Sequence, residues 1–197
     1  MQIDIRQASA SDCNQATPLI FSSGPAAFNY IFPNPSRFLK YSFNKGQSQF
    51  GFNNHYLAIL DGQVVATIAC FDRHQAKIME LSCIMDMAKH LGWNFWGSAI
   101  KGLRFERIVP KPIKHSLCIA HLGVSKALQN RGIGTQLINW AIEKAKIQGY
   151  QSVSLDVAQS NPGARKLYES LGFIEHRKQK STLPGIADHA TLVLTLR

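Results

Sequence analysis

The chain has 197 residues, of which 45% are hydrophobic and 17% charged, and it carries a formal net charge of +10. This length and composition predict one globular domain and exclude a wholly disordered chain, which would contain few apolar residues and abundant charge. The positive charge favours an anionic partner, such as nucleic acid, an acidic membrane surface or a phosphorylated ligand. The most apolar stretch, residues 78–109, is interrupted by charged side chains, which excludes a membrane-spanning helix.

The cysteines and the N-terminus indicate the compartment. Cys13, Cys70, Cys83 and Cys118 show no paired spacing, so we expect neither a zinc site nor a disulfide framework. Cys70 and Cys118 lie in apolar runs, which favours buried thiols. The first residues alternate polar and apolar and do not form a basic start followed by an apolar stretch. We therefore expect a cytoplasmic protein.

In the first half of the chain, alternation and turn residues predict mainly strands. Capping side chains follow the first strand, at residues 9–12. The dipeptide Asp61-Gly62 separates two strand-like runs, which predicts a β-hairpin. A later stretch has apolar residues at helical spacing, and Gly92 and Gly97 are expected to divide it into two helices. The predicted ranges are a strand at 2–8, a short helix at 36–43, the hairpin strands at 55–60 and 63–71, and the two helices at 77–109.

In the second half, predicted strands alternate with predicted helices. Pro162 suits the first turn of a helix, and Gly172 suits the position just after its end. Locally paired strands followed by this alternation indicate a mixed α/β or α+β sheet. The predicted ranges are strands at 115–124, 152–158, 173–180 and 190–196, with helices at 132–148 and 162–170.

The most informative motif lies between the strand at 115–124 and the helix that follows it. Gly132 and Gly134 let the backbone approach a ligand without Cβ clashes. Unpaired amides at the start of the helix favour an anion, and Arg131 adds a positive charge. These features predict a phosphate cradle. Leu137 occupies the position of the third Rossmann glycine and the Gly-Lys-Ser/Thr of a P-loop is missing, so neither dinucleotide pattern applies; glycines that serve only helix packing are the alternative.

A second motif, from Asn161 to Phe173, identifies the family that the chain resembles. The combination Gln-x-x-Gly-x-Gly, a strand, and Asn-x-x-Ala-x-x-Leu-Tyr-x-x-x-Gly-Phe resembles the GCN5-related N-acetyltransferase (GNAT) family, most clearly from Ser116 to Glu175. This resemblance implies an α/β (α+β) fold with a mixed, mostly antiparallel sheet, in which a parallel strand pair splays apart and helices flank the sheet. It also implies one acetyltransferase domain over residues 1–197, with a helical insertion at about 77–110.

The resemblance further implies acetyl-CoA as the cosubstrate and predicts its contacts. Backbone groups of the strand before the first motif would pair with the pantetheine arm, in the gap between the splayed strands. The first motif would surround the pyrophosphate, and the second would contact the arm. The expected cofactor-binding residues are Leu122, Gly123, Val124, Gln129, Asn130, Arg131, Gly132, Ile133, Gly134, Thr135, Asn161, Ala164 and Tyr168.

Three residues are candidates for proton transfer. The family places a tyrosine at the position of Tyr168, whose phenol can protonate the departing thiolate; packing within its helix is the alternative. His121 is the titratable side chain close to the expected strand separation, so it is one candidate base. Asp156, on the next strand, is the other candidate base, and ordered water could also serve. We expect direct attack of the amine, without a covalent acyl-enzyme.

The acceptor and the partners are less sharply predicted. A primary amine of a small molecule or peptide is expected, with no membrane partner and no nucleic acid, and a homodimer remains a candidate assembly. Trp93, Phe95 and Trp96 lie in the long helical stretch, which forms either a wall of the acceptor pocket or an extra core layer. The alternative functions are a non-catalytic acetyl-CoA sensor and nucleic-acid binding, the latter through a basic run at Lys101, Arg104, Arg107, Lys111 and Lys114.

Overall fold

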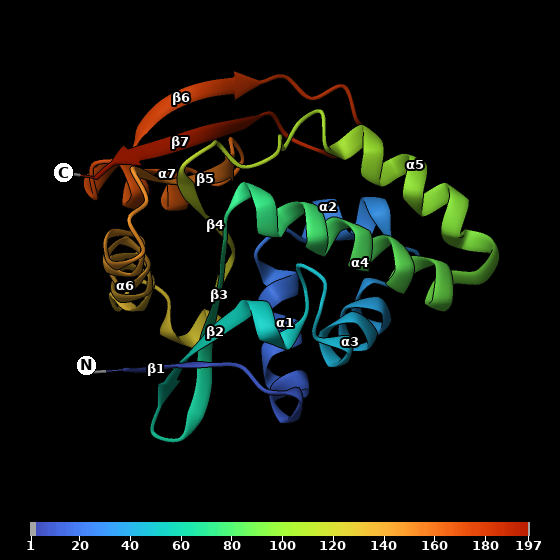
Figure 1. Cartoon of the computed structure of the whole chain (residues 1–197), viewed down its shortest axis with the longest axis horizontal. Coiled ribbons are helices and arrows are strands. Elements are labelled where there is room, and N and C mark those ends of the chain that lie inside the picture. Colours follow the sequence, from blue (N-terminus) through green and yellow to red (C-terminus); the bar gives the residue numbers. More distant parts are fainter. Residues whose placement is uncertain (1–2, 197) are drawn as a thin grey trace.

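In the computed structural model, which describes residues 3–196, seven strands form one mixed sheet with helices on both faces (Figure 1). The strand order is β1-β2-β3-β4-β5-β7-β6, and the only parallel pair among the described strands is β4–β5. This confirms the predicted mixed, mostly antiparallel sheet. The strands are β1 Asp4–Gln7, β2 His55–Leu60, β3 Gln63–Phe71, β4 Ser116–Val124, β5 Ser152–Ala158, β6 Ile174–Gln179 and β7 His189–Thr195.

The helices divide between the two faces of the sheet. Because successive side chains of a strand point to opposite faces, Ala58 packs with α6 in one core while Leu57 packs with α1 and α3 in another. Figure 1 shows α6 and α7 on one side of the sheet and the other five helices on the opposite side. The helices are α1 Cys13–Ser22, α2 Pro25–Ile31, α3 Pro35–Lys45, α4 Arg73–Leu91, α5 Phe95–Phe105, α6 Ile133–Ile147 and α7 Pro162–Ser170.

The β2–β3 hairpin confirms the turn predicted at Asp61-Gly62. Asp61 has φ +50° and Gly62 has φ +75°. A two-residue hairpin turn with both central residues at positive φ matches the right-handed twist of its strands, and Asp-Gly tolerates this conformation well. Local residue chemistry therefore determines the connection between these two strands.

The N-terminal region forms more helix than predicted. The expected helix at 36–43 is present as α3, but α1 and α2 occupy a segment without a predicted helix. A short 3₁₀ turn precedes α1, and Asp12 at its end accepts hydrogen bonds from Arg6 at 2.7 Å and from the Ser9 amide at 2.8 Å. These bonds hold the pKa of Asp12 down at about 2. These bonds connect β1 to the 3₁₀ turn that leads into α1.

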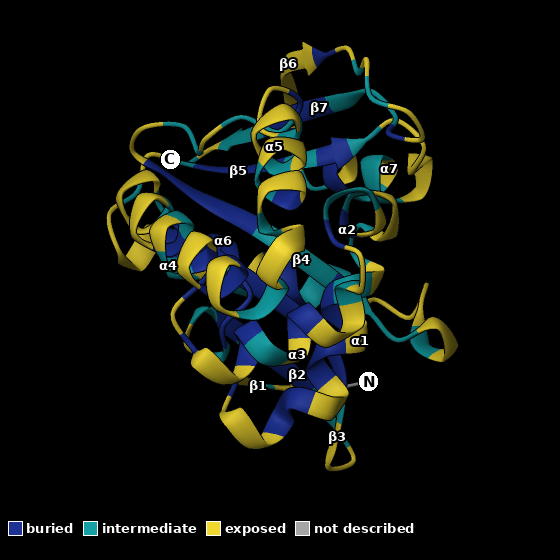
Figure 2. Cartoon of the chain, turned by 90° about the vertical axis from the view of Figure 1, so that its right-hand side faces the viewer, coloured by how far each residue is buried: buried dark blue, intermediate teal, exposed yellow. Residues whose placement is uncertain are grey.

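The helical pair α4–α5 corrects one prediction and narrows another. The break comes at Gly92, with φ +52°, whereas Gly97 lies inside α5, so the predicted break at Gly97 is wrong. Of the two alternatives left open for the aromatic residues, the extra core layer is excluded for Trp93 and Trp96, which are 99% and 71% exposed. Phe95, by contrast, packs against the core on the α1–α3 side. Figure 2 shows the exposed ribbon of both helices turned toward the viewer.

The cysteines and the lengths of the helices can also be compared with the sequence analysis. The thiols of all four cysteines are buried and unpaired within the described chain, as predicted for Cys70 and Cys118. Of the helices that the structure describes, none combines the length and the apolar character needed to cross a bilayer.

Candidate active site

β4 and β5 separate partway along their length. Their backbone pairing begins at Ser116 and Ser152 and ends at Ile119 and Leu155, although both strands continue further. The register of β4 against β3 shifts by one residue just beyond this point, at a bulge that includes His121 with φ +51°. A bulge bends its strand and interrupts pairing. The facing edges of the two strands therefore present unpaired backbone N–H and C=O groups, as the resemblance implied.

The expected pantetheine-binding residues Leu122, Gly123 and Val124 lie directly after this bulge. A Cβ atom built on Gly123 would be 2.1 Å from the backbone oxygen of Leu19, because α1 crosses β4 here. Only glycine fits such a close approach of two backbones. Gly123 thus seats α1 against the end of β4, and the backbone of this segment borders the separation between the strands.

The first motif forms an uncapped helix N-terminus beside the strand separation. Asn130 and Gly132 adopt positive φ values of +62° and +80°, and α6 begins at Ile133. The first backbone bond of this helix runs from the Gln136 amide to the Gly132 oxygen at 3.0 Å, and no side chain of the described residues caps the helix. The three amides that precede Gln136 are therefore available to a ligand.

The surroundings of this N-terminus fit an anionic ligand. A Cβ atom built on Gly132 would meet no heavy atom within 4 Å, so the loop borders open space. Gly134 instead allows α6 to pass close to α7, since its Cβ would lie 3.4 Å from Leu167 Cδ2. Gln129, Asn130 and Arg131 are exposed around the loop, and Gln129 Nε2 donates to the Val124 oxygen at 3.3 Å. Free amides, the helix dipole and a guanidinium suit the diphosphate of coenzyme A.

Tyr168 and Asn161 occupy opposite ends of α7. Asn161 Oδ1 accepts a hydrogen bond from the Ala164 amide at 3.1 Å and so caps the helix. Tyr168 is 8% exposed and packs beside the Phe173 ring, with 6.1 Å between ring centroids. Burial raises its pKa to about 12, and its hydroxyl has no hydrogen-bond partner among the described residues. The phenol is therefore protonated at neutral pH.

Asp156 lies on the face of the sheet opposite Tyr168. Its neighbours Leu155 and Val157 share a core with Tyr168, so strand alternation directs the Asp156 side chain to the α4–α5 side. Thr191 Oγ1 on β7 donates to Asp156 Oδ1 at 2.6 Å. Burial nevertheless raises the Asp156 pKa to about 6. A protonated phenol and a carboxylate with a raised pKa therefore lie on opposite faces of the sheet.

His121, the other candidate base, has a different environment. Its ring lies among Phe28, Phe50 and His55, with centroid separations of 6.0, 5.1 and 5.8 Å. Burial lowers its pKa to about 4, and its buried Nε2 has no hydrogen-bond partner in the described chain. His55 is also neutral, since its pKa falls to about 3 in the fully buried site. A proton on His55 would have to be accommodated without solvent, and a proton on the buried Nε2 of His121 would have no hydrogen-bond partner in the described chain.

A groove of about 340 Å³ opens beside Asp156. Its floor includes Cys118, Ser154 and Thr191 from β4, β5 and β7. Burial raises the pKa of Cys118, which keeps that thiol protonated. Thr191 is a site residue that the sequence analysis missed. Its alternation within a predicted strand was visible, but its position opposite Asp156 depends on the β5–β7 register, which sequence alone does not reveal.

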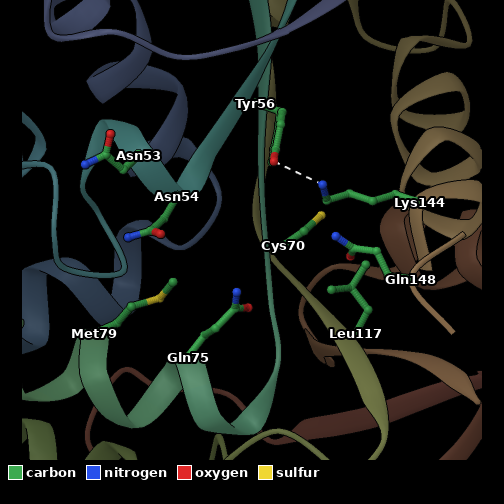
Figure 3. Close-up of a pocket in the computed structure, with 9 residues that line it drawn as sticks. All are labelled: Asn53, Asn54, Tyr56, Cys70, Gln75, Met79, Leu117, Lys144 and Gln148. Carbon is green, nitrogen blue, oxygen red and sulfur yellow. Dashed lines mark hydrogen bonds between the residues drawn. The ribbon is translucent and has the colours of Figure 1, made fainter. Parts of the chain in front are cut away.

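A second, smaller cavity of about 130 Å³ lies near the start of α4 and the end of α6 (Figure 3). Lys144 Nζ donates to the Tyr56 hydroxyl at 3.1 Å across it, and Gln75 and Gln148 line it. None of the predicted site residues lines this cavity. Within residues 3–196, no cluster of three or more His, Cys, Asp or Glu side chains is arranged to hold a metal ion.

Comparison with known proteins agrees with this geometry. The family model described as "Acetyltransferase (GNAT) family" matches residues 25–173. "Probable N-acetyltransferase camello" of Xenopus laevis is 33% identical over 82 residues, 40% of this chain and 37% of that protein. "[Ribosomal protein bS18]-alanine N-acetyltransferase" of Salmonella typhimurium is 31% identical over 74 residues, 38% of this chain and 50% of that protein. The matches therefore span half or less of these relatives.

Solved structures show the same fold over nearly the whole chain. The "Crystal structure of N-acetyltransferase from Staphylococcus aureus Mu50" has a TM-score of 0.72 and 18% identity, and covers 97% of this chain and 100% of that one. "The crystal structure of acetyltransferase" has a TM-score of 0.69 and 22% identity, with 98% and 100% covered. From the strand separation, the two motifs in their structural context and the family match, the chain belongs to the GNAT acetyltransferase family.

Proposed function

We propose that the chain transfers the acetyl group of acetyl-CoA to a primary amine of a small molecule or peptide, by direct attack of that amine. The observation that carries the proposal is the separation of β4 from β5, followed directly along the chain by the uncapped N-terminus of α6. Bound acetyl-CoA supplies the activated acetyl group as a thioester. We also propose that residues 77–110, between β3 and β4, are a helical insertion in a single acetyltransferase domain.

The proposed binding of acetyl-CoA uses mainly backbone groups. Backbone groups of Leu122, Gly123 and Val124, on the part of β4 that β5 does not pair, would bond the amides of the pantetheine arm. The amides at the start of α6, with Gln129, Asn130, Arg131, Gly132, Ile133, Gly134 and Thr135, would hold the diphosphate. Asn161 and Ala164 would contact the arm from α7, where the Asn161 side-chain oxygen caps the helix and its amide nitrogen has no hydrogen bond to another described residue.

Proton transfer is assigned to Asp156 and Tyr168. Above about pH 6 the Asp156 carboxylate is ionised and can accept the proton that the attacking amine loses. Tyr168 holds a proton on its hydroxyl oxygen and would deliver it to the leaving sulfur. His121 is less suited to the base role, because its buried ring accepts a proton only near pH 4. Two groups with different pKa values can divide the acid and base roles.

The relatives define the breadth of the acceptor class. One is named as an N-acetyltransferase of an alanine of ribosomal protein bS18, and one structural neighbour is named as an agmatine N-acetyltransferase. Peptide amines and small amines therefore both belong in a first substrate panel for this chain.

The direct experiment measures free thiol release from acetyl-CoA in the presence of a panel of amines. We expect release that depends on both the amine and the protein. Tyr168→Phe should lower kcat by about 100-fold, because one proton-transfer group contributes 10²–10⁴-fold in typical enzymes, while the Kd for coenzyme A stays within about twofold. Stabilisation by acetyl-CoA without turnover of any amine would instead identify a sensor, and an unchanged kcat in Tyr168→Phe would remove the acid role.

A further inference from the structure

The groove beside Asp156 has an unusual balance of charge for a site that accepts an amine. Asp156 is the one carboxylate among the described residues that line it, whereas Arg73, Lys111, Lys114 and Arg177 all border the same space. These basic residues come from separate parts of the chain, namely the start of α4, the loop before β4, and β6. The fold therefore gathers positive charge at this groove.

Most of this positive charge has no acidic partner. Lys111 Nζ is 2.8 Å from Glu80 Oε2, so its charge is matched within the chain. Arg73, Lys114 and Arg177 form no salt bridge with any acidic side chain of residues 3–196. Each is exposed at the groove, so its charge is open to a ligand. Three unpaired cations against one carboxylate make the groove electropositive.

An electropositive groove discriminates among amines. A bare alkylammonium ion or a polyamine is repelled by the rim, whereas a carboxylate or phosphate in the same molecule is attracted to it. Charge-assisted hydrogen bonds from arginine or lysine to such an anion are among the stronger polar contacts in proteins. The carboxylate of Asp156 remains available for the amine end of the ligand.

The size and the wall of the groove narrow the ligand class further. A volume of about 340 Å³ is near the lower end of the range for small-molecule sites, roughly 300–1,000 Å³. Pro110, Pro112 and Ile113 form an apolar section of its lining. An acceptor with a short apolar side chain would cover this apolar section of the lining.

We propose that the acceptor is a small amine that carries a carboxylate or phosphate group in the same molecule, with an α-amino acid bearing an apolar side chain as the simplest example. Its amine lies toward Asp156 and the strand separation, its anionic group toward Arg177 and Lys114, and its apolar part against the Pro110–Ile113 wall. This inference rests on the proposed acetyltransferase function and specifies the acceptor of that reaction.

The test compares acceptors that share one side chain. Leucine, its aminophosphonate analogue and 3-methylbutylamine differ only in the anionic group, and kcat/KM is measured for each and corrected for the fraction of free amine. We expect the anionic compounds to exceed 3-methylbutylamine by about tenfold or more, as a charge-assisted hydrogen bond of about 1.5–3 kcal/mol requires. The better of the two anionic compounds distinguishes carboxylate from phosphate recognition.

Charge variants show whether the groove causes the preference. Lys114→Gln combined with Arg177→Gln should reduce the preference to within about threefold, since both expected anion contacts are then neutral. Lys178→Gln is the control for position, because it removes one positive charge next to Arg177 on β6 at a residue that does not line the groove. Its preference should match that of the unmodified protein.

The outcomes separate this inference from the proposed function. Equal kcat/KM values for leucine and 3-methylbutylamine, with transfer to both, would overturn the anionic acceptor and leave the acetyltransferase function in place. A preference that survives in the Lys114/Arg177 double variant would overturn the assignment of the groove. Absence of transfer to every amine tested would overturn the proposed function and this inference together.

Discussion

At the residue scale, local environment separates the two candidate bases. Asp156 keeps a hydrogen bond from Thr191 and borders an open groove, so its pKa rises only to about 6. His121 lies among aromatic rings, and the pKa of its imidazole falls to about 4. Burial disfavours the charged form of both groups, which raises the pKa of an acid and lowers that of a base. At neutral pH this leaves an ionised carboxylate at the groove and a neutral imidazole among the aromatic rings.

The pH dependence of turnover follows from Asp156. Since its pKa is about 6, kcat/KM should fall about tenfold per pH unit below that value and level off above about pH 7. Asp156→Asn should remove this acidic limb and lower the plateau by about 100-fold, because the base is lost. The measurement is kcat/KM from pH 5 to 8 for both proteins, with the amine concentration corrected for its own ionisation. An acidic limb that persists in Asp156→Asn would transfer the base role to another group.

At the element scale, Gly123 and Gly97 lie in opposite packing environments. Gly123 lies where α1 touches β4, so a Cβ atom would collide with the Leu19 backbone. Gly97 lies inside α5, where a Cβ atom would meet no heavy atom within 4 Å. The same substitution should therefore have opposite effects on stability at the two positions.

We expect Gly123→Ala to lower the free energy of unfolding by about 2 kcal/mol or more, because neither backbone can move without disturbing its element. Gly97→Ala should raise it by about 0.5–1 kcal/mol, the gain of alanine over glycine within a helix. Urea denaturation of both variants measures the difference. Two changes of the same sign would contradict the packing assigned to α1 and β4.

The α4–α5 pair also presents apolar side chains to solvent. The exposed residues of this set are Ile78, Leu81, Ile84, Met85, Trp93, Trp96, Ile100 and Leu103. Because Trp93 and Trp96 lose little exposed area on folding, Trp93→Ser and Trp96→Ser should each change the free energy of unfolding by no more than about 0.5 kcal/mol. Tryptophan fluorescence of the folded protein, quenched by acrylamide, checks the exposure independently. A loss of about 2 kcal/mol in either variant would show that the ring is buried in a core.

At the scale of the whole molecule, local signals were predictable and long-range register was not. Asp61-Gly62 determines its own turn, and Pro162 with Asn161 marks the start of α7, so these elements could be located from neighbouring residues. The capping side chains at residues 9–12 lie directly before α1, although no range was predicted for that helix. Gly97 was misjudged because a single glycine costs a helix only about 1 kcal/mol relative to alanine, which does not end α5.

The candidate site also combines features that contiguous motifs predict with features that depend on the fold. The uncapped start of α6 and the position of Tyr168 follow from motifs that are contiguous in sequence. The Thr191–Asp156 hydrogen bond and the aromatic surroundings of His121 depend on how distant segments meet. The electropositive rim of the groove likewise combines the loop before β4 with β6. Sequence patterns predicted the proposed cofactor side of the site, while the proposed acceptor side depends on the fold.

The most direct test of the account is the melting temperature of the protein in the presence of coenzyme A and of pantetheine, which lacks the diphosphate. A ligand at 100 times its Kd adds about 2.7 kcal/mol of stability, and in a domain of this size each kcal/mol raises Tm by about 2–4 °C. We therefore expect coenzyme A to raise Tm by roughly 5–10 °C, with most of this shift lost for pantetheine because it offers nothing to the amides of α6. Equal shifts for the two ligands, or no shift at millimolar coenzyme A, would contradict binding of a diphosphate at residues 129–135.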